Sequence, residues 1–135
     1  MKFALEHLGL PAREPVALKD WYARALGAKL VFENAQSPAF LLALPGGVMI
    51  EIYGGDLSLK EVANNKFNGW RHVALRVESL ETAKAELEQR GVRFDEPIKP
   101  AGGGGRVLFF QDPEGNLLHL VERPPDSVIP GPCPK

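Results

Sequence analysis

The segments His7-Leu8-Gly9-Leu10 and His72-Val73-Ala74-Leu75 decide the fold of this 135-residue chain. They are two copies of one pattern, a histidine followed by alternating aliphatic and small residues, and they lie 65 residues apart. Each half of the chain then ends in an aliphatic stretch with one ionisable residue, Glu51 in the first half and His119 in the second, 68 residues apart. Self-similarity at a nearly constant offset indicates a duplicated supersecondary unit.

Both halves show the same predicted order of elements, strand–helix–strand–strand–strand. In the first half we expect a helix from about residue 13 to Gly27 and strands at 3–10, 29–33, 39–43 and 48–53. In the second half we expect a helix at 80–90, closed by Gly91, and strands at 70–77, 92–94, 107–110 and 117–121. This order predicts an α+β fold in which each helix packs on one face of a sheet and leaves the other face free.

The length predicts one domain over residues 1–123, made of module one at 1–54, a linker at 55–69 and module two at 70–123. Within the linker, Ser58-Leu59-Lys60-Glu61 matches a capping box and predicts a short helix. The proline-rich stretch 124–135 predicts an extended C-terminal tail.

The composition argues against several classes of partner. A formal net charge of -1 provides no electrostatic reason to expect nucleic acid or an anionic membrane. No segment approaches the roughly 20 apolar residues that span a bilayer, and the first six residues lack a signal-peptide pattern. The lone cysteine, Cys133, cannot form an internal disulfide, which favours a reducing cytoplasm.

Alternation along the strands places each ionisable residue opposite an aliphatic face. Around Glu51, for example, Ile50 and Ile52 share one face and Met49, Glu51 and Tyr53 share the other. The same holds for His7, His72 and His119. We therefore expect one face of each strand to pack on a helix and the other to line a cleft.

Four metal-capable side chains at equivalent points of a duplication predict a metal site built from His7, Glu51, His72 and His119. A single strand histidine is more often a hydrogen-bonded structural residue, and a merely polar cleft is the alternative for the set. Imidazoles with one carboxylate suit zinc, nickel, iron, cobalt or manganese. With open coordination positions, such an ion acts as a Lewis acid.

Three stretches of the chain resemble the vicinal oxygen chelate superfamily, also called the glyoxalase/bleomycin-resistance/dioxygenase family. They are Leu5–Leu10 with the helix that follows, Gly69–Leu75, and Phe110–Glu122, where Asp112-Pro113-Glu114-Gly115-Asn116 leads into an aliphatic strand. The resemblance covers about residues 3 to 123. It implies two βαβββ modules forming an incomplete barrel around a cleft that holds a divalent metal, with ligands at His7, Glu51, His72 and His119.

The resemblance also implies a small-molecule substrate and a homodimer, in which modules of two chains sometimes combine to build each site. This chain departs from the family pattern at His119, where the last strand usually offers a glutamate. Glu122 lies on the opposite face and is not counted as a ligand. Glu51 is therefore our candidate for a ligand that doubles as general base, and His119 for a ligand or proton shuttle.

The resemblance leaves the reaction open. We favour lyase or isomerase chemistry slightly over ring cleavage by a dioxygenase. The alternatives are a metal-free binding protein of the bleomycin-resistance type and a degenerate domain whose ligands do not converge. Four further features have a structural interpretation beside a functional one. The loop Gly102–Gly105 is either a connector or a lid, and Arg106 is either a solvated side chain or the partner of a substrate carboxylate. Tyr53 and Trp70 are either half-buried aromatics or cleft residues.

Overall fold

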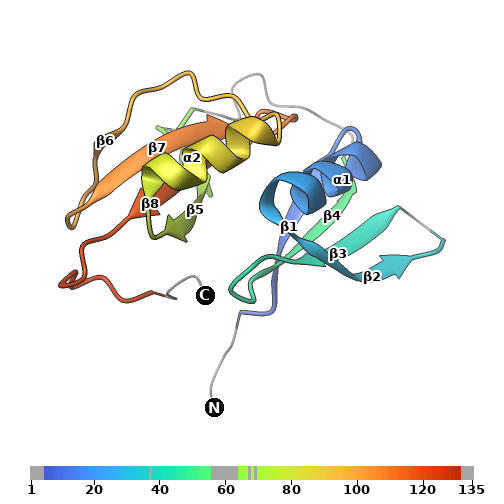
Figure 1. Ribbon diagram of the computed structural model, residues 1–135. Coiled ribbons are helices and arrows are strands. Elements are labelled where there is room, and N and C mark those ends of the chain that lie inside the picture. The colour runs from blue at the N-terminus through green and yellow to red at the C-terminus, as the bar shows by residue number, and fades with distance from the viewer. Residues whose placement is uncertain (1–4, 37, 56–63, 67, 69, 132–135) are drawn as a thin grey trace, which may run out of the picture. The chain divides into compact units, whose positions relative to one another are not determined.

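The computed structural model describes residues 5–36, 38–55, 64–66, 68 and 70–131. The chain divides into two compact units, Met1–Lys60 and Glu61–Lys135. Each unit combines one helix with one four-stranded mixed sheet (Figure 1). The predicted α+β class and the two βαβββ modules are thereby confirmed. The sheets are separate, and neither closes into a barrel. The helix predicted at 58–61 lies outside the described residues.

The first unit contains a sheet in the order β1-β4-β3-β2. Strand β1 pairs with β4 in parallel, and the other pairs are antiparallel. Its elements are β1 (His7–Ala12), α1 (Pro15–Leu26), β2 (Lys29–Asn34), β3 (Ala39–Ala43) and β4 (Met49–Gly54). The parallel pairing places the first and last strands of the module side by side in the sheet.

Helix α1 forms where local sequence and tertiary packing agree. Pro15 occupies the first turn, where its missing N–H costs nothing. Gly27 ends the helix in the left-handed conformation, with φ of 70°, which a glycine adopts without strain. The helix buries Leu18, Trp21, Tyr22 and Ala25 against a sheet whose β4 contributes the buried Ile50 and Ile52. The two aromatic residues of this helix, Trp21 and Tyr22, therefore belong to the core.

The second unit repeats this arrangement, with strand order β5-β8-β7-β6 and a parallel β5–β8 pair. Its elements are β5 (His72–Val77), α2 (Leu80–Gln89), β6 (Lys99–Pro100), β7 (Arg106–Gln111) and β8 (Leu117–Glu122). Helix α2 contacts β8 and β7, where Leu108, Leu118 and Leu120 are buried. Both modules therefore cover one sheet face with a helix.

The strand predicted at 92–94 is wrong. The N–H of Val92 donates to Leu87 O at 2.9 Å as part of the end of α2, so it cannot serve a strand ladder. Phe94 packs its ring against Phe110, with centroids 5.3 Å apart. The apolar residues are thus used for packing, and the pairing occurs later, over the two residues of β6.

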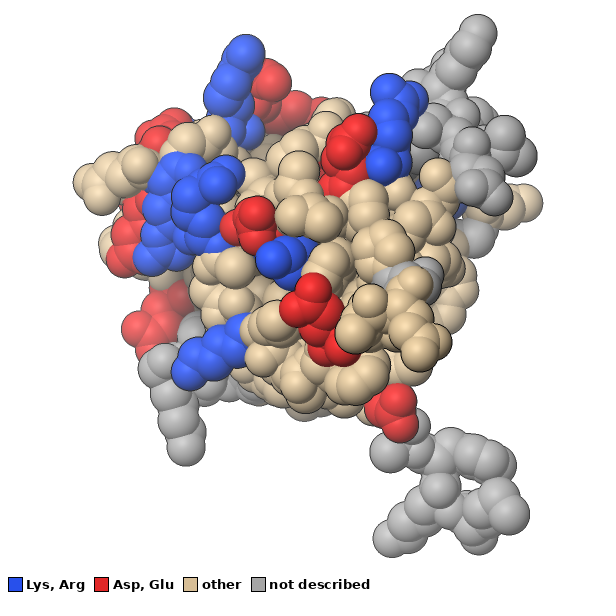
Figure 2. Space-filling view, turned by 90° about the vertical axis from the view of Figure 1, so that its right-hand side faces the viewer, with Lys and Arg blue, Asp and Glu red and all other residues tan. Residues whose placement is uncertain are grey.

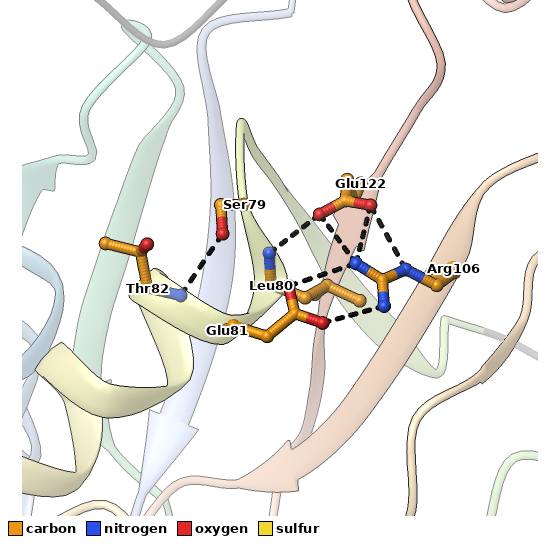
Figure 3. A network of polar contacts seen from close by, with 6 residues as sticks. All are labelled: Ser79, Leu80, Glu81, Thr82, Arg106 and Glu122. Carbon is orange, nitrogen blue, oxygen red and sulfur yellow. Dashed lines mark hydrogen bonds and ion pairs between the residues drawn. The ribbon is translucent and has the colours of Figure 1, made fainter.

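The N-terminus of α2 is tied to β8 by a carboxylate (Figure 3). Glu122 Oε2 accepts a hydrogen bond from the backbone N–H of Leu80 at 2.9 Å. Arg106, on β7, donates to Glu122 and to Glu81 of the helix. The Leu80 N–H and the Arg106 guanidinium together lower the pKa of Glu122. A negative charge at a helix N-terminus is favourable because the unpaired N–H groups there are partly positive.

The described part of the proline-rich tail, residues 124–131, contacts the second unit. A turn closes between Pro124 O and the N–H of Ser127 at 3.0 Å. Arg76 Nη1 donates to Ile129 O at 3.3 Å. Gly103 fits against the Ile129 side chain, which leaves no room for a side chain at that glycine.

On the face of the molecule shown in Figure 2, acidic and basic side chains lie interspersed among uncharged ones. None of the helices in the described residues is both long and apolar enough to cross a membrane.

Candidate metal centre

The same strand register places two potential ligands together in each module. In the first unit, Gly9 of β1 pairs with Glu51 of β4, and His7 lies two residues before Gly9. In the second unit, Ala74 of β5 pairs with His119 of β8, and His72 lies two residues before Ala74. In both modules the two potential ligands are therefore diagonal neighbours on adjacent parallel strands. The residue directly opposite the second ligand is small, Gly9 or Ala74.

In the first unit the two side chains are in direct contact. His7 Nε2 lies 3.2 Å from Glu51 Oε2, and both side chains are partly open to solvent, at 35% and 38% exposure. The Tyr53 ring lies over Gly9. Its Cε1 and Oη atoms are each 3.5 Å from the place where a Cβ atom would stand if Gly9 had a side chain. Gly9 thus leaves space for the aromatic ring beside the pair. Imidazole and carboxylate are both groups that bind divalent metal ions, so the two side chains of this contact are suitable ligands.

In the second unit the two imidazoles pack on each other beneath an aromatic ring. The His72 and His119 ring centroids are 4.9 Å apart. Phe109, which pairs with His119 across β7 and β8, lies 4.8 Å from the His119 ring and 6.1 Å from the His72 ring. His119 is only 7% exposed, whereas His72 is exposed.

All three histidines direct Nδ1 at an oxygen that can only accept. Nδ1 of His7 lies 3.0 Å from Glu6 Oε1, and Nδ1 of His72 lies 2.9 Å from Asn65 Oδ1. Nδ1 of His119 lies 3.3 Å from the backbone oxygen of Leu120. For His72 and His119, Nδ1 is then the donor, which favours the tautomer that carries its lone pair on Nε2. Metal-binding histidines in proteins are oriented in this way by a second hydrogen bond. In His7 both ring nitrogens face carboxylates, Nδ1 that of Glu6 and Nε2 that of Glu51.

Burial keeps His119 in the neutral form that a metal ligand needs. Loss of hydration lowers the pKa of His119 below its ordinary value of 6.5, and the nearby His72 and Arg123 lower it further. At neutral pH this imidazole is therefore uncharged, with a lone pair available on Nε2.

Within the described residues, no three His, Cys, Asp or Glu side chains gather into a metal-binding group. Each unit by itself supplies two of the four predicted ligands, His7 with Glu51 and His72 with His119. The donor types fit a divalent ion, because three imidazole nitrogens and one carboxylate match the preferences of zinc and its neighbours in the periodic table. Convergence of the two pairs stays a prediction.

The predicted division of strand faces holds for the first unit and fails for the last strand of the second. Ile50 and Ile52 are buried, while Glu51 and Tyr53 on the other face are partly exposed. On β8, by contrast, Leu117, His119 and Val121 are buried as well as Leu118 and Leu120. Strands β4 and β8 are both internal in their sheets, so position in the sheet does not explain the difference. On β8 the His72 and Phe109 rings pack against His119 on the face away from α2.

Other predicted features have mainly structural roles. Arg106 is an ion-pair partner of Glu122 and Glu81, not a solvated side chain, and the exclusion of Glu122 as a ligand agrees with its position at α2. The loop Gly102–Gly105 is the turn between β6 and β7, in which Gly105 has a φ of 93° and approaches the Glu122 carbonyl too closely for any side chain. Trp70 is 81% exposed, not half-buried.

Sequence reasoning missed the residues that surround the histidines. Asn65 lies in the segment between the modules and carries no motif of its own. Glu6 precedes His7 directly and was visible only as a charged neighbour. Phe109 could have been found, because the hairpin around Asp112–Asn116 fixes the pairing of β7 with β8 and hence the position opposite His119.

That hairpin is built by Asp112, whose carboxylate accepts from the N–H groups of Glu114 and Asn116 and from the Asn116 side chain. A sequence profile of the Glyoxalase/Bleomycin resistance protein/Dioxygenase superfamily matches residues 4–120. The chain belongs to this superfamily. The resemblance seen in the sequence is thereby confirmed, and the match spans both modules.

Three proteins that are similar to this chain carry informative names or structures. The uncharacterized protein YaeR of Escherichia coli (strain K12) is 28% identical over 123 residues, covering 88% of this chain and 95% of YaeR. A lactoylglutathione lyase of Pseudomonas aeruginosa is 24% identical over 148 residues, covering 90% of this chain and 83% of the lyase. The crystal structure of a FosX variant, a fosfomycin resistance protein from Listeria monocytogenes, superposes with a TM-score of 0.72 at 19% identity, covering 93% of this chain and 96% of that chain; it holds Mn(II) and 1S,2S-dihydroxypropylphosphonic acid.

Proposed function

We propose that this protein is a divalent-metal enzyme that acts on a small substrate with neighbouring oxygen atoms, by lyase or isomerase chemistry. His7, Glu51, His72 and His119 would hold the ion. The observation that carries the proposal is the orientation of the histidines, since all three direct Nδ1 at an oxygen and leave Nε2 for another partner. A protein that only sequesters a ligand has no need for this arrangement.

The bound ion would supply Lewis-acid chemistry, which stabilises an oxyanion formed on the substrate. Glu51 is the candidate base. Its carboxylate is partly exposed and in contact with His7, so it can take a proton from a substrate carbon. His119 would act as ligand or proton shuttle, and its burial beneath Phe109 limits the access of water to that side of the pair.

One structure of this fold supports metal use, because the FosX variant contains Mn(II). The lactoylglutathione lyase supports lyase chemistry by its name alone. Their identity to this chain is 19% and 24%, so the ligand set here has to be tested on the protein itself.

The test is metal content per chain, measured by mass spectrometry on untagged protein incubated with zinc, nickel, iron, cobalt or manganese. We expect nearly one ion per chain in the wild type. His72→Ala and Glu51→Gln should weaken binding by more than about 100-fold, above the usual effect of losing an outer hydrogen-bond partner. Glu88→Gln, on the outer face of α2, is the control and should bind like the wild type. Wild-type protein that binds none of these ions would contradict the proposal and favour a metal-free binding protein.

We further propose a cytoplasmic homodimer, as the superfamily implied. Mixing His7→Ala with His72→Ala protein tests whether modules of two chains share a site. If they do, exchange of subunits creates one intact set of four ligands in each mixed dimer, and metal binding returns. If each chain builds its own site, the mixture binds no more metal than either variant alone.

A further inference from the structure

Two arginines extend the row of histidines along one face of the second sheet. His72, Ala74 and Arg76 share a face of β5 by alternation, and Arg76 pairs in register with Val121 of β8. On β8 the same alternation takes His119 through Val121 to Arg123, the residue that follows the strand. The face therefore presents two imidazoles followed by two guanidiniums.

The contacts connect the two guanidiniums through Ile129 and Gly103, and they place Arg123 close enough to act on His119. Arg123 Nη1 donates to the carbonyls of Gly102 and Gly104, at 2.5 and 2.6 Å. Arg76 Nη1 donates to Ile129 O, and the Ile129 side chain packs on Gly103, between the two glycines that Arg123 contacts. The charge of Arg123 is also one of the causes that lower the pKa of His119, after burial and His72.

Among the residues that the structure describes, no carboxylate neutralises either arginine. Within the described part of the chain, the partners of Arg76 and Arg123 are backbone carbonyls, and neither forms an ion pair with a carboxylate. Arg106, by contrast, has two carboxylates. Carbonyl groups orient a guanidinium but leave its full charge in place, and a guanidinium has five N–H donors. Both side chains are only half-exposed, so solvent screens them incompletely.

The first module shows that the fold does not require these charges. Counted from the paired ligands, Arg76 corresponds to Pro11 and Arg123 to Gly55. The same topology thus forms with two uncharged residues at these positions. A structural role common to both modules therefore cannot account for the arginines.

We propose that Arg76 and Arg123 bind the anionic group of the substrate, a carboxylate or a phosphate-like oxyanion, beside the metal centre. The substrate class is then a small oxyanion whose neighbouring oxygens reach the ion while its charged end reaches the guanidiniums. Arg76 lies four residues beyond His72 on β5, roughly 13 Å along the strand at about 3.3 Å per residue, which a long arginine side chain and a small substrate can bridge together. Guanidinium suits this task because it binds such anions with two parallel hydrogen bonds.

This substrate class rests on the proposed metal site, but the anion subsite can be tested without metal. Inorganic phosphate and malonate are titrated into metal-free, isotope-labelled protein, and the arginine Nε–H resonances are followed by NMR. We expect saturable shifts for the Arg76 and Arg123 resonances, and phosphate and malonate distinguish a phosphate-like from a dicarboxylate preference. If neither phosphate nor malonate causes saturable shifts of these resonances, the proposal is overturned.

Matched variants separate this proposal from the metal site. Arg76→Gln and Arg123→Gln should each weaken anion binding at least about tenfold. Arg76→Lys keeps the charge and should retain more of the binding, while Arg24→Gln, in the last turn of α1, should leave it unchanged. Metal affinity of these variants should equal that of the wild type. If the wild type, Arg76→Gln and Arg123→Gln bind the anions equally well, the anion subsite is overturned. If the wild type binds the anions but no metal ion, only the proposed metal-dependent function is overturned.

Discussion

The two modules share one strand register, yet the paired side chains have opposite surroundings. His7 and Glu51 contact each other directly and remain partly open to solvent. The His72 and His119 rings pack against each other at an interplanar angle of 59°, beside Phe109, and His119 is buried. The duplicated backbone therefore places two potential ligands at equivalent points in each module. Residues of the neighbouring strand, such as Phe109 on β7, determine how deeply each pair is buried.

This difference suggests a division of labour. The exposed pair contains the only carboxylate of the four predicted ligands, and a carboxylate that exchanges protons with substrate needs access. The buried pair consists of neutral imidazoles, which bind metal without first losing a proton. The two arginines that we assign to substrate binding also belong to the second module, where the first has Pro11 and Gly55.

The largest expected difference between the modules is the effect of removing one histidine on stability. His119→Ala should lower the free energy of unfolding by about 1–3 kcal/mol, because it leaves a cavity under Phe109. His7→Ala should change it by less than about 0.5 kcal/mol, since the side chain is partly exposed. Urea unfolding of metal-free protein measures both. Equal effects would show that the two pairs are equally buried.

The next effect concerns the groups that orient the two exposed histidines. Asn65→Ala should weaken metal binding about 10- to 100-fold, because His72 loses the acceptor for Nδ1–H. Glu6→Ala should weaken it less, since His7 keeps its contact with Glu51 through Nε2 when Glu6 is lost. Asn65→Asp keeps an acceptor oxygen and should restore most of the affinity. If Asn65→Ala binds metal like the wild type, the hydrogen bond has no role in the site.

The two helices should also respond differently to loss of their N-terminal residues. Ser79→Ala should destabilise the protein by about 1 kcal/mol, because Ser79 Oγ accepts from the N–H of Thr82. Glu14→Ala should have almost no effect, since Glu14 makes no capping hydrogen bond at α1. Thermal unfolding of the two variants, compared at one pH, measures this difference.

The smallest effect is a pH dependence that belongs to the second module. Because burial lowers the pKa of His119 below 6.5, the unfolded chain binds a proton that the folded chain does not. Stability should therefore be complete above pH 6.5 and should fall as the pH drops towards the lowered pKa. Urea unfolding at several pH values should show a flatter profile for His119→Gln. An unchanged slope in that variant would place the titrating group elsewhere.

The duplicated fold could be predicted from the sequence because local patterns specify it twice. Pro15 and Gly27 mark the ends of α1, and the aliphatic face of β4 is visible as alternation around Glu51. The strand predicted at 92–94 failed because the hydrogen bond from Val92 to Leu87 competes with a ladder, and apolar residues alone do not distinguish packing from pairing.

The candidate ligands could also be proposed from the sequence, but their surroundings could not. The burial of His119 depends on Phe109, which reaches it only through the β7–β8 register. The partner of His72, Asn65, comes from a segment that no periodicity marks. Contacts of this kind depend on where the chain folds back, and no local pattern records that.

The most direct test of the account counts the imidazoles on one bound ion. Cobalt(II) is added to metal-free protein, and the proton NMR spectrum is searched for strongly shifted, solvent-exchangeable Nδ1–H signals. If the two pairs hold one ion, three such signals appear together at one cobalt per chain, and each disappears in the matching His→Gln variant. Two signals that depend only on His72 and His119, with none from His7, would contradict the claim that the modules act as one site.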